Sequence, residues 1–67
     1  MRIFVNSKSV EVSNQLTLSG FIASLGLEST DGMAVAVNET VVYNQEWNTK
    51  ILHENDAILI IRATKGG

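Results

Sequence analysis

The chain ends in two adjacent glycines, and the carboxylate of Gly67 is its most distinctive chemical group. Two glycines at the last two positions arise by chance in roughly 0.5% of sequences, given the ~7% average usage of glycine. Glycine has no Cβ, so an extended Gly-Gly can pass through a narrow catalytic channel and bring its carboxylate to a reactive group. Either Gly67 is the site of chemistry, with Lys65 and Gly66 threading into the active site of a partner, or the two glycines are a frayed end of the chain without a function.

The other polar side chains do not form a catalytic or metal site. Cysteine is absent, which excludes disulfides, thiolate ligands and a cysteine nucleophile. The single histidine, His53, lies beside Glu54 and Asp56 in a predicted turn, where we expect all three side chains to be solvated. No further ligand is spaced to complete a metal site with them. We interpret Trp47 as a packing residue rather than a surface for a cofactor.

Length and charge narrow the class of protein. The chain has 67 residues, is 45% hydrophobic and carries a net charge of −2. A chain of this length can form one small domain with a hydrophobic core. Without disulfides or other cross-links, we do not expect it to be a self-contained enzyme. An acidic chain with scattered basic residues does not fit nucleic acid, which binds clustered Lys and Arg. The longest apolar run, residues 57–61, is far shorter than a membrane span or signal peptide. We expect a cytoplasmic protein.

The first half of the chain predicts a hairpin followed by a helix. Residues 2–12 alternate polar and apolar side chains around a turn at residues 6–9, which indicates two strands. The period then changes to that of a helix with a buried face, formed by Leu18, Phe21, Ile22 and Leu25. Thr17 is the predicted N-cap of this helix, and Gly26 the residue that ends it.

The second half predicts three more strands. Residues 33–37 and 41–43 are apolar and flank a turn at residues 38–40, residues 44–49 suit an irregular or single-turn helical segment, and residues 53–56 form another turn. In that turn Asn55 can adopt a positive φ. The predicted order is β-β-α-β-β-turn-β, an α+β fold with one mixed sheet and a single helix on one face.

The last strand is apolar on both faces, which is typical of a central strand. Ile58 and Ile60 point to one face, and Leu59 and Ile61 to the other. Since one helix shields only one face of a sheet, one pair should be partly exposed. Either the segment 44–53 folds over that pair, or the pair is a docking surface for a partner. For docking we single out Leu59, Ile61 and Arg62.

Several of these features together resemble the sulfur carrier family of thiamine biosynthesis, ThiS. They are the stretch Val35-Ala36-Val37-Asn38 followed by Val41-Val42, then Trp47, then Leu52 and Asp56-Ala57-Ile58, and the closing Gly66-Gly67. The resemblance implies a ubiquitin-like β-grasp fold with its first and last strands adjacent and parallel at the centre of the sheet. Residues 1–62 then form one domain, and residues 63–67 a flexible tail. Two positions depart from the family pattern, Asn55 in place of a glycine and Gly20 in place of a carboxylate.

The resemblance also implies a mechanism and partners. An E1-like enzyme of the ThiF type would adenylate Gly67 with ATP and Mg, which this chain does not itself bind. A persulfide donor would then give a C-terminal thiocarboxylate, and a thiazole synthase of the ThiG type would take the sulfur. The chain would be a carrier and not an enzyme. Three alternatives stay open: the small subunit of molybdopterin synthase, a ubiquitin-like protein modifier, and a plain interaction domain whose Gly-Gly end has no function.

Overall fold

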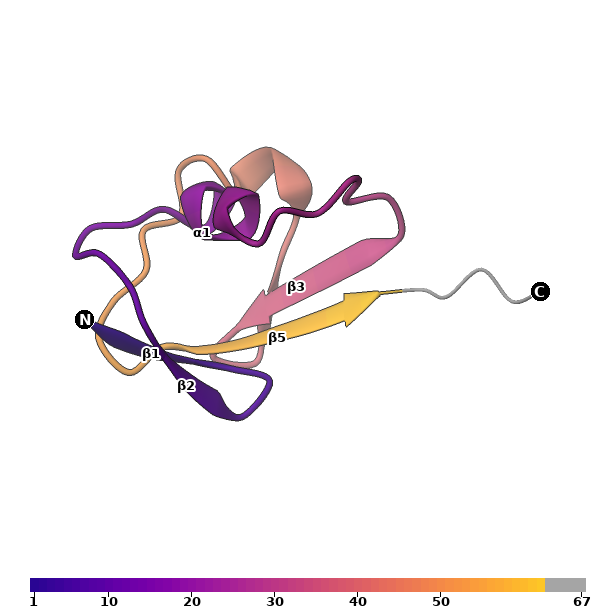
Figure 1. Ribbon diagram of the computed structural model, residues 1–67. Helices are drawn as coiled ribbons and strands as arrows, with labels where there is room; N and C mark the ends of the chain where they lie inside the picture. The colour runs from indigo at the N-terminus through magenta and orange to yellow at the C-terminus, as the bar shows by residue number, and fades with distance from the viewer. Residues whose placement is uncertain (63–67) are drawn as a thin grey trace.

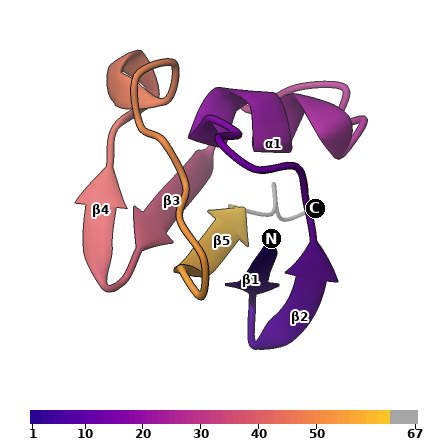
Figure 2. The ribbon, with the colours of Figure 1, turned by 90° about the vertical axis from the view of Figure 1, so that its left-hand side faces the viewer.

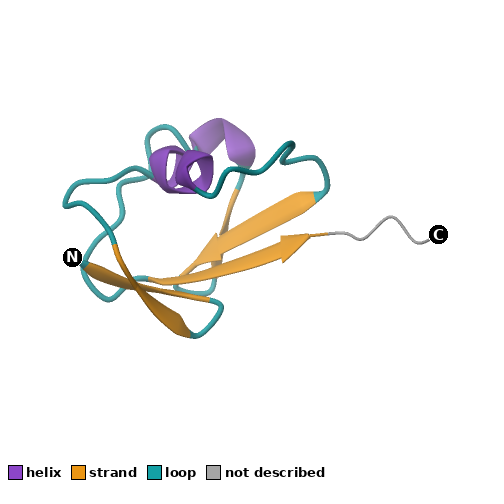
Figure 3. Ribbon diagram, viewed as in Figure 1, coloured by secondary structure: helices purple, strands orange, loops and turns teal. Residues whose placement is uncertain are grey.

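The computed structural model describes residues 1–62, which form one five-stranded mixed sheet with a helix on one face (Figures 1 and 3). The elements in chain order are β1 (Arg2–Val5), β2 (Lys8–Glu11), α1 (Leu18–Ser24), β3 (Met33–Val37), β4 (Thr40–Val42), the 3-10 helix η1 (Asn44–Glu46) and β5 (Ala57–Arg62). The strands lie side by side in the order β2-β1-β5-β3-β4 (Figure 2). The predicted α+β class, element order and β-grasp arrangement are confirmed.

β5 is the central strand, as its continuous apolar run predicts. It pairs in parallel with β1, where Phe4 lies opposite Ala57 and Val5 opposite Ile58. On its other side it pairs antiparallel with β3 over five residue pairs, from Val37 with Ile58 to Met33 with Arg62. The first and last strands are therefore adjacent and parallel. The strand is also one residue longer than the predicted 57–61.

Both hairpins close through tight two-residue turns in the left-handed region. Asn6 and Ser7 have φ of 50° and 71°, and Asn38 and Glu39 have φ of 51° and 71°. Asparagine tolerates this region better than other residues with a Cβ, and positive φ at both positions matches the twist of the flanking strands. The turns are shorter than the sequence predicts, so Lys8 and Thr40 belong to strands rather than to turns.

Helix α1 has the predicted caps but a smaller buried face than the sequence predicts. The Thr17 hydroxyl accepts a hydrogen bond from the amide of Gly20 at 3.1 Å, and Gly26 has a φ of 69°. Leu18, Phe21 and Ile22 are buried as expected. Leu25 is 41% exposed, so its predicted place in the core is wrong. The helix ends at Ser24, and Leu25 is its C-cap.

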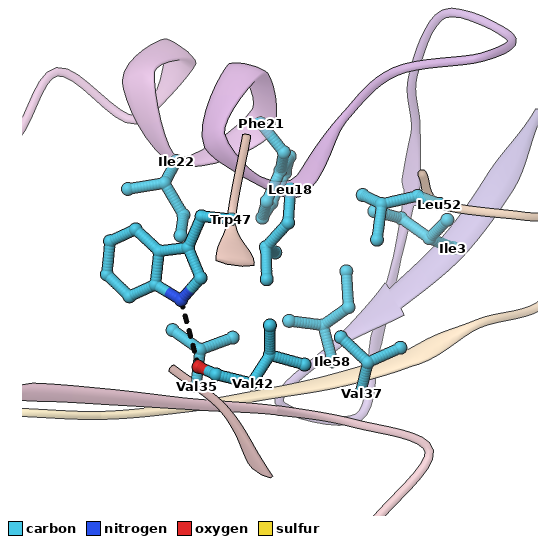
Figure 4. Packing of buried hydrophobic residues seen from close by; sticks show 10 residues of the cluster. All are labelled: Ile3, Leu18, Phe21, Ile22, Val35, Val37, Val42, Trp47, Leu52 and Ile58. Atoms are coloured by element: carbon cyan, nitrogen blue, oxygen red, sulfur yellow. Dashed lines mark hydrogen bonds between the residues drawn. The ribbon is translucent and has the colours of Figure 1, made fainter. Parts of the chain in front are cut away.

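The core lies between α1, the segment around η1 and the near face of the sheet (Figure 4). Trp47 is buried, and its indole Nε1–H donates to the carbonyl oxygen of Val42 at 2.9 Å. This bond satisfies the one polar atom of the ring, so Trp47 can fill the core without leaving an unpaired donor. The packing role predicted for Trp47 is confirmed. The fully buried members of the core include Ile3, Leu18, Val35 and Leu52.

In the described part of the chain, no helix is long and apolar enough to cross a membrane.

Candidate docking face and C-terminus

The sheet face turned away from α1 is apolar at its centre, and we call it the outer face. Strand alternation places Ile58 and Ile60 toward the core, where Ile58 is buried and Ile60 packs against the cluster. Leu59 and Ile61 therefore point outward, and they are 49% and 57% exposed. The strand pairings place further residues on this face: Phe4, Ala34, Ala36, Val41 and Ala57.

The segment 44–53 does not cover the outer face. It lies on the same side of the sheet as α1 (Figures 1 and 2), held there by backbone bonds from Leu18 to Lys50 and from Ser19 to Trp47. Of the two explanations offered for the second apolar face of β5, cover by this segment is therefore wrong. Leu59, Ile61 and Val41, at 55% exposed, leave an apolar patch open to solvent.

An exposed apolar patch on a monomer often marks a binding surface. About half of each of three large aliphatic side chains is exposed, and alanines lie between them. A contiguous apolar patch of roughly 300–600 Å² is the largest that a typical monomer shows, and it is often functional. A standard interface buries about 800 Å² of each partner, so this patch can form the centre of a transient interface with a polar rim.

Arg62 does not share the face of Leu59 and Ile61. Alternation places its side chain on the helix side of β5, and its Nη2 donates to the carbonyl oxygen of Ser29 at 3.5 Å. The Arg62 guanidinium therefore lies against the loop that follows α1, at the point where the described chain ends. The three docking residues singled out from the sequence thus fall on two faces.

Two turn asparagines hold β5 in place from opposite sides. The Asn6 side-chain Oδ1 accepts from the Ile60 amide at 2.9 Å, and the Asn38 Oδ1 accepts from the Ala57 amide at 2.9 Å. The backbone turns away from β5 at each asparagine. The side-chain carbonyl therefore accepts the hydrogen bond that a backbone carbonyl would accept if the strand continued. The Asn6 Nδ2 also donates to the Ile60 carbonyl at 3.4 Å. These two side chains fix the start and middle of the strand that leads to the terminus.

The carboxylate of Asp56 also fixes the start of β5, which corrects the prediction of a solvated turn residue. Asp56 is only 8% exposed. Its Oδ1 accepts from Asn38 Nδ2 at 2.9 Å, and its Oδ2 accepts from the backbone amide of His53 at 2.8 Å. Burying a charged carboxylate is costly unless it is hydrogen-bonded in this way. Asn38 supplies one of these donors from 18 positions away, which the local turn pattern does not reveal.

The neighbours of Asp56 in this turn are exposed, as predicted. The His53 side chain is 75% exposed, and its Nδ1 lies 3.9 Å from Asp56 Oδ2. Glu54 is exposed and accepts a hydrogen bond from the Arg2 amide at 3.0 Å. Asn55 has a φ of 69°, which confirms that it takes the conformation usual for glycine. Within residues 1–62, no three His, Cys, Asp or Glu side chains lie close enough together to hold a metal ion.

The proposed chemical terminus follows β5 directly. Lys65, Gly66 and Gly67 lie outside the described residues, as does the whole predicted tail 63–67. The described structure therefore contributes the strand that leads to the terminus and the outer face beside it.

Comparison with known proteins assigns a family and a fold. The model of the ThiS family matches residues 1–67, the whole chain. The chain is similar to the crystal structure of the thiamine biosynthesis protein ThiS from Geobacter metallireducens, with a TM-score of 0.85, 20% identity and full coverage of both chains. It is also similar to the NMR solution structure of a thiamine biosynthesis protein from Geobacter metallireducens, with a TM-score of 0.81, 20% identity, and coverage of 100% of this chain and 88% of that one. No curated protein matches the chain in sequence.

Proposed function

This chain belongs to the ThiS family, and from that premise we propose that it is a sulfur carrier protein of thiamine biosynthesis. In this proposal the protein is not an enzyme. It is a substrate that partner enzymes modify at the carboxylate of Gly67. The family match supports the pathway, and the Gly66-Gly67 terminus supports the position of the modification.

The first proposed step activates the terminus. A carboxylate is a poor acyl donor, because oxide is a poor leaving group. A carboxylate oxygen of Gly67 attacks the α-phosphorus of ATP on an E1-like enzyme of the ThiF type, and pyrophosphate leaves. The product is an acyl-adenylate whose leaving group is AMP. ATP and Mg belong to this partner, and the carrier binds neither by itself.

The second step installs the sulfur. The terminal sulfur of a persulfide donor attacks the acyl carbon, and AMP leaves. A thiol of the sulfur-transfer partner then cleaves the S–S bond by exchange, which leaves a thiocarboxylate on Gly67 and a disulfide on the partner. A thiazole synthase of the ThiG type takes this sulfur into the thiazole ring. The carrier has no cysteine, so its own residues offer no thiol to compete for the sulfur.

One structural observation carries the proposal: the strand that presents the open apolar residues is the strand that continues into the Gly-Gly terminus. Leu59 and Ile61 lie outward on β5, and five residues follow Arg62. Five residues span at most about 18 Å. A partner that docks on the outer face therefore needs its catalytic centre within that reach of the end of β5.

Intact-protein mass spectrometry tests the proposal. The carrier is incubated with a ThiF-type enzyme, Mg-ATP and a persulfide donor, and we expect the mass to rise by the difference between sulfur and oxygen. A variant without Gly67 is the matched control and should show no gain. No gain on the full chain, or an equal gain on the shortened one, would refute the proposal.

A second measurement separates this carrier from its relatives. We expect the protein to co-purify with a thiazole synthase and not with a molybdopterin synthase large subunit. A ladder of isopeptide-linked conjugates in cell lysate would instead identify a ubiquitin-like modifier.

A further inference from the structure

The outer face contains a hollow of about 360 Å³ at the start of β5. Two small residues, Ala36 and Ala57, line it together with the larger Leu59 and Phe4, which lie opposite them on the neighbouring strands. The remaining lining residues are Asn6, Ser7, Glu39 and Ile58. Most of the hollow's surface is therefore apolar, and its volume is within the range of about 300–1,000 Å³ seen for binding pockets.

The register of the sheet explains why the hollow forms there. Val5 of β1 and Val37 of β3 both lie opposite Ile58, so the two strands beside β5 end at the same level. Their turns, Asn6–Ser7 and Asn38–Glu39, then form walls on both sides of β5. The side-chain bonds of the two asparagines to β5 hold these walls in place. The hollow is thus preformed, which lowers the entropic cost of filling it.

The hollow has an acidic rim. Glu39 is the one charged residue among the side chains that line it. Within residues 1–62 the close contacts between basic and acidic side chains are Arg2 with Glu11 and His53 with Asp56, so Glu39 has no basic partner there. An apolar floor beside an unpaired carboxylate is complementary to a large apolar side chain carried next to a lysine or arginine.

We propose that this hollow receives one large apolar side chain, adjacent to a basic residue, from the adenylating partner. The inference rests on the proposed function, and it names the point on the outer face at which that partner is anchored. Apolar side chains seated in preformed pockets at the centre of an interface contribute most of the binding energy. The acidic rim selects the partner by charge, and Leu59 and Ile61 continue the apolar face from this anchor along β5 toward its end.

A second copy of this chain is the alternative occupant. The exposed Ile51 lies next to Lys50 and offers similar chemistry. Such a contact would give a dimer if two copies exchange it reciprocally, and a ring or an open chain if they do not. Sedimentation velocity of the carrier alone tests this. The proposal expects a monomer, and concentration-dependent growth abolished by Ala57→Leu would overturn it.

Filling the hollow tests the anchor directly. Ala57→Leu places the chain's own side chain in the space, at an exposed strand position where leucine is tolerated. We expect its affinity for a ThiF-type enzyme, measured by titration calorimetry, to fall about tenfold or more. The matched control is Ala23→Leu, the same change at an exposed position of α1, which should leave affinity unchanged. Equal affinity of Ala57→Leu and the wild type would overturn the proposal.

Charge at the rim is tested separately. Glu39→Lys should weaken the complex more than Glu39→Gln, and the salt dependence of the affinity should fall in both variants. Glu46→Lys is the control, because Glu46 belongs to η1, a segment on the same side of the sheet as α1 (Figure 2). If Glu39→Lys binds as tightly as Glu46→Lys, the charge argument is wrong.

A peptide probe makes the test independent of adenylation. Acetyl-Phe-Lys-amide and acetyl-Phe-Glu-amide are titrated against the labelled carrier, and amide chemical shifts are followed by NMR. We expect saturable shifts at the residues that line the hollow, stronger with the lysine peptide and absent in Ala57→Leu. Shifts elsewhere, or none, would overturn the proposal. Saturable shifts at the hollow without binding of the ThiF-type enzyme would refute the proposed function but uphold the chemistry of the hollow.

Discussion

Replacing Asp56 should destabilise the whole domain, because its buried carboxylate joins two turns to the start of β5. The two oxygens accept from Asn38 Nδ2 at 2.9 Å and from the His53 amide at 2.8 Å. A hydrogen bond to a charged group contributes about 1.5–3 kcal/mol. Asn38 is exposed and can bond to water instead, so we expect Asp56→Ala to cost about 2–4 kcal/mol in total. A domain of this length has roughly 3–10 kcal/mol of stability.

The series Asp56→Asn and Glu54→Gln makes this prediction quantitative. Asp56→Asn keeps one acceptor and loses the other, so its cost should be about half that of alanine. Glu54 lies in the same turn, and Gln keeps the oxygen that accepts from the Arg2 amide, so Glu54→Gln should change the free energy of unfolding by less than about 0.5 kcal/mol. The assay is urea unfolding followed by fluorescence of Trp47, the single tryptophan, which is buried.

The order of the urea midpoints of the three variants tests whether the Asp56 carboxylate holds β5. We expect midpoints to fall from Glu54→Gln through Asp56→Asn to Asp56→Ala, with an unchanged denaturant slope. If Asp56→Ala unfolds at the same urea concentration as Glu54→Gln, the carboxylate does not hold β5 and the reasoning fails.

Three further predictions concern the backbone, the core and the outer face. Gly26→Ala should lower the free energy of unfolding in urea by about 1–2 kcal/mol, because the φ of Gly26 is 69°. No atom lies within 4 Å of a new Cβ, so the cost comes from the backbone conformation alone. An unchanged free energy of unfolding would show that the chain relaxes there. Trp47→Phe should lower the free energy of unfolding, followed by circular dichroism, by about 1–3 kcal/mol, because the Val42 carbonyl loses its donor. An unchanged free energy of unfolding would refute the role of that bond. The double variant Leu59→Ser, Ile61→Ser should keep the melting temperature but lose about tenfold or more in affinity for a ThiF-type enzyme. Ile51 is similarly exposed, and Ile51→Ser should leave this affinity unchanged. Equal losses of affinity would refute the outer face as the docking surface.

The sequence predicts those parts of the fold that depend on local periodicity. Leu18, Phe21 and Ile22 repeat with the helical period and are buried in α1. The apolar run that begins at Ala57 correctly indicates a central strand, because a strand with two apolar faces needs neighbours on both sides. The positive φ predicted for Asn55 is observed, because asparagine tolerates this region, and turns form within the predicted ranges 6–9 and 38–40.

The features that the sequence does not predict depend on contacts between distant segments. The buried Asp56 is hydrogen-bonded by Asn38 from the turn after the neighbouring strand, and a local turn pattern contains no sign of that contact. Leu25 matches the helical period but falls after the last helical residue. Strand alternation by itself places Arg62 on the helix side of β5, because Arg62 follows Ile58 and Ile60 in steps of two residues.

The central claim is that sulfur moves from Gly67 of this chain into a thiazole. The direct measurement uses carrier whose thiocarboxylate has been formed from an isotopically heavy persulfide, mixed with a ThiG-type thiazole synthase and its other substrates. Mass spectrometry of the thiazole should show the heavy sulfur in proportion to the label on the carrier. A thiazole that contains only light sulfur, formed while the labelled thiocarboxylate remains intact, would contradict the account.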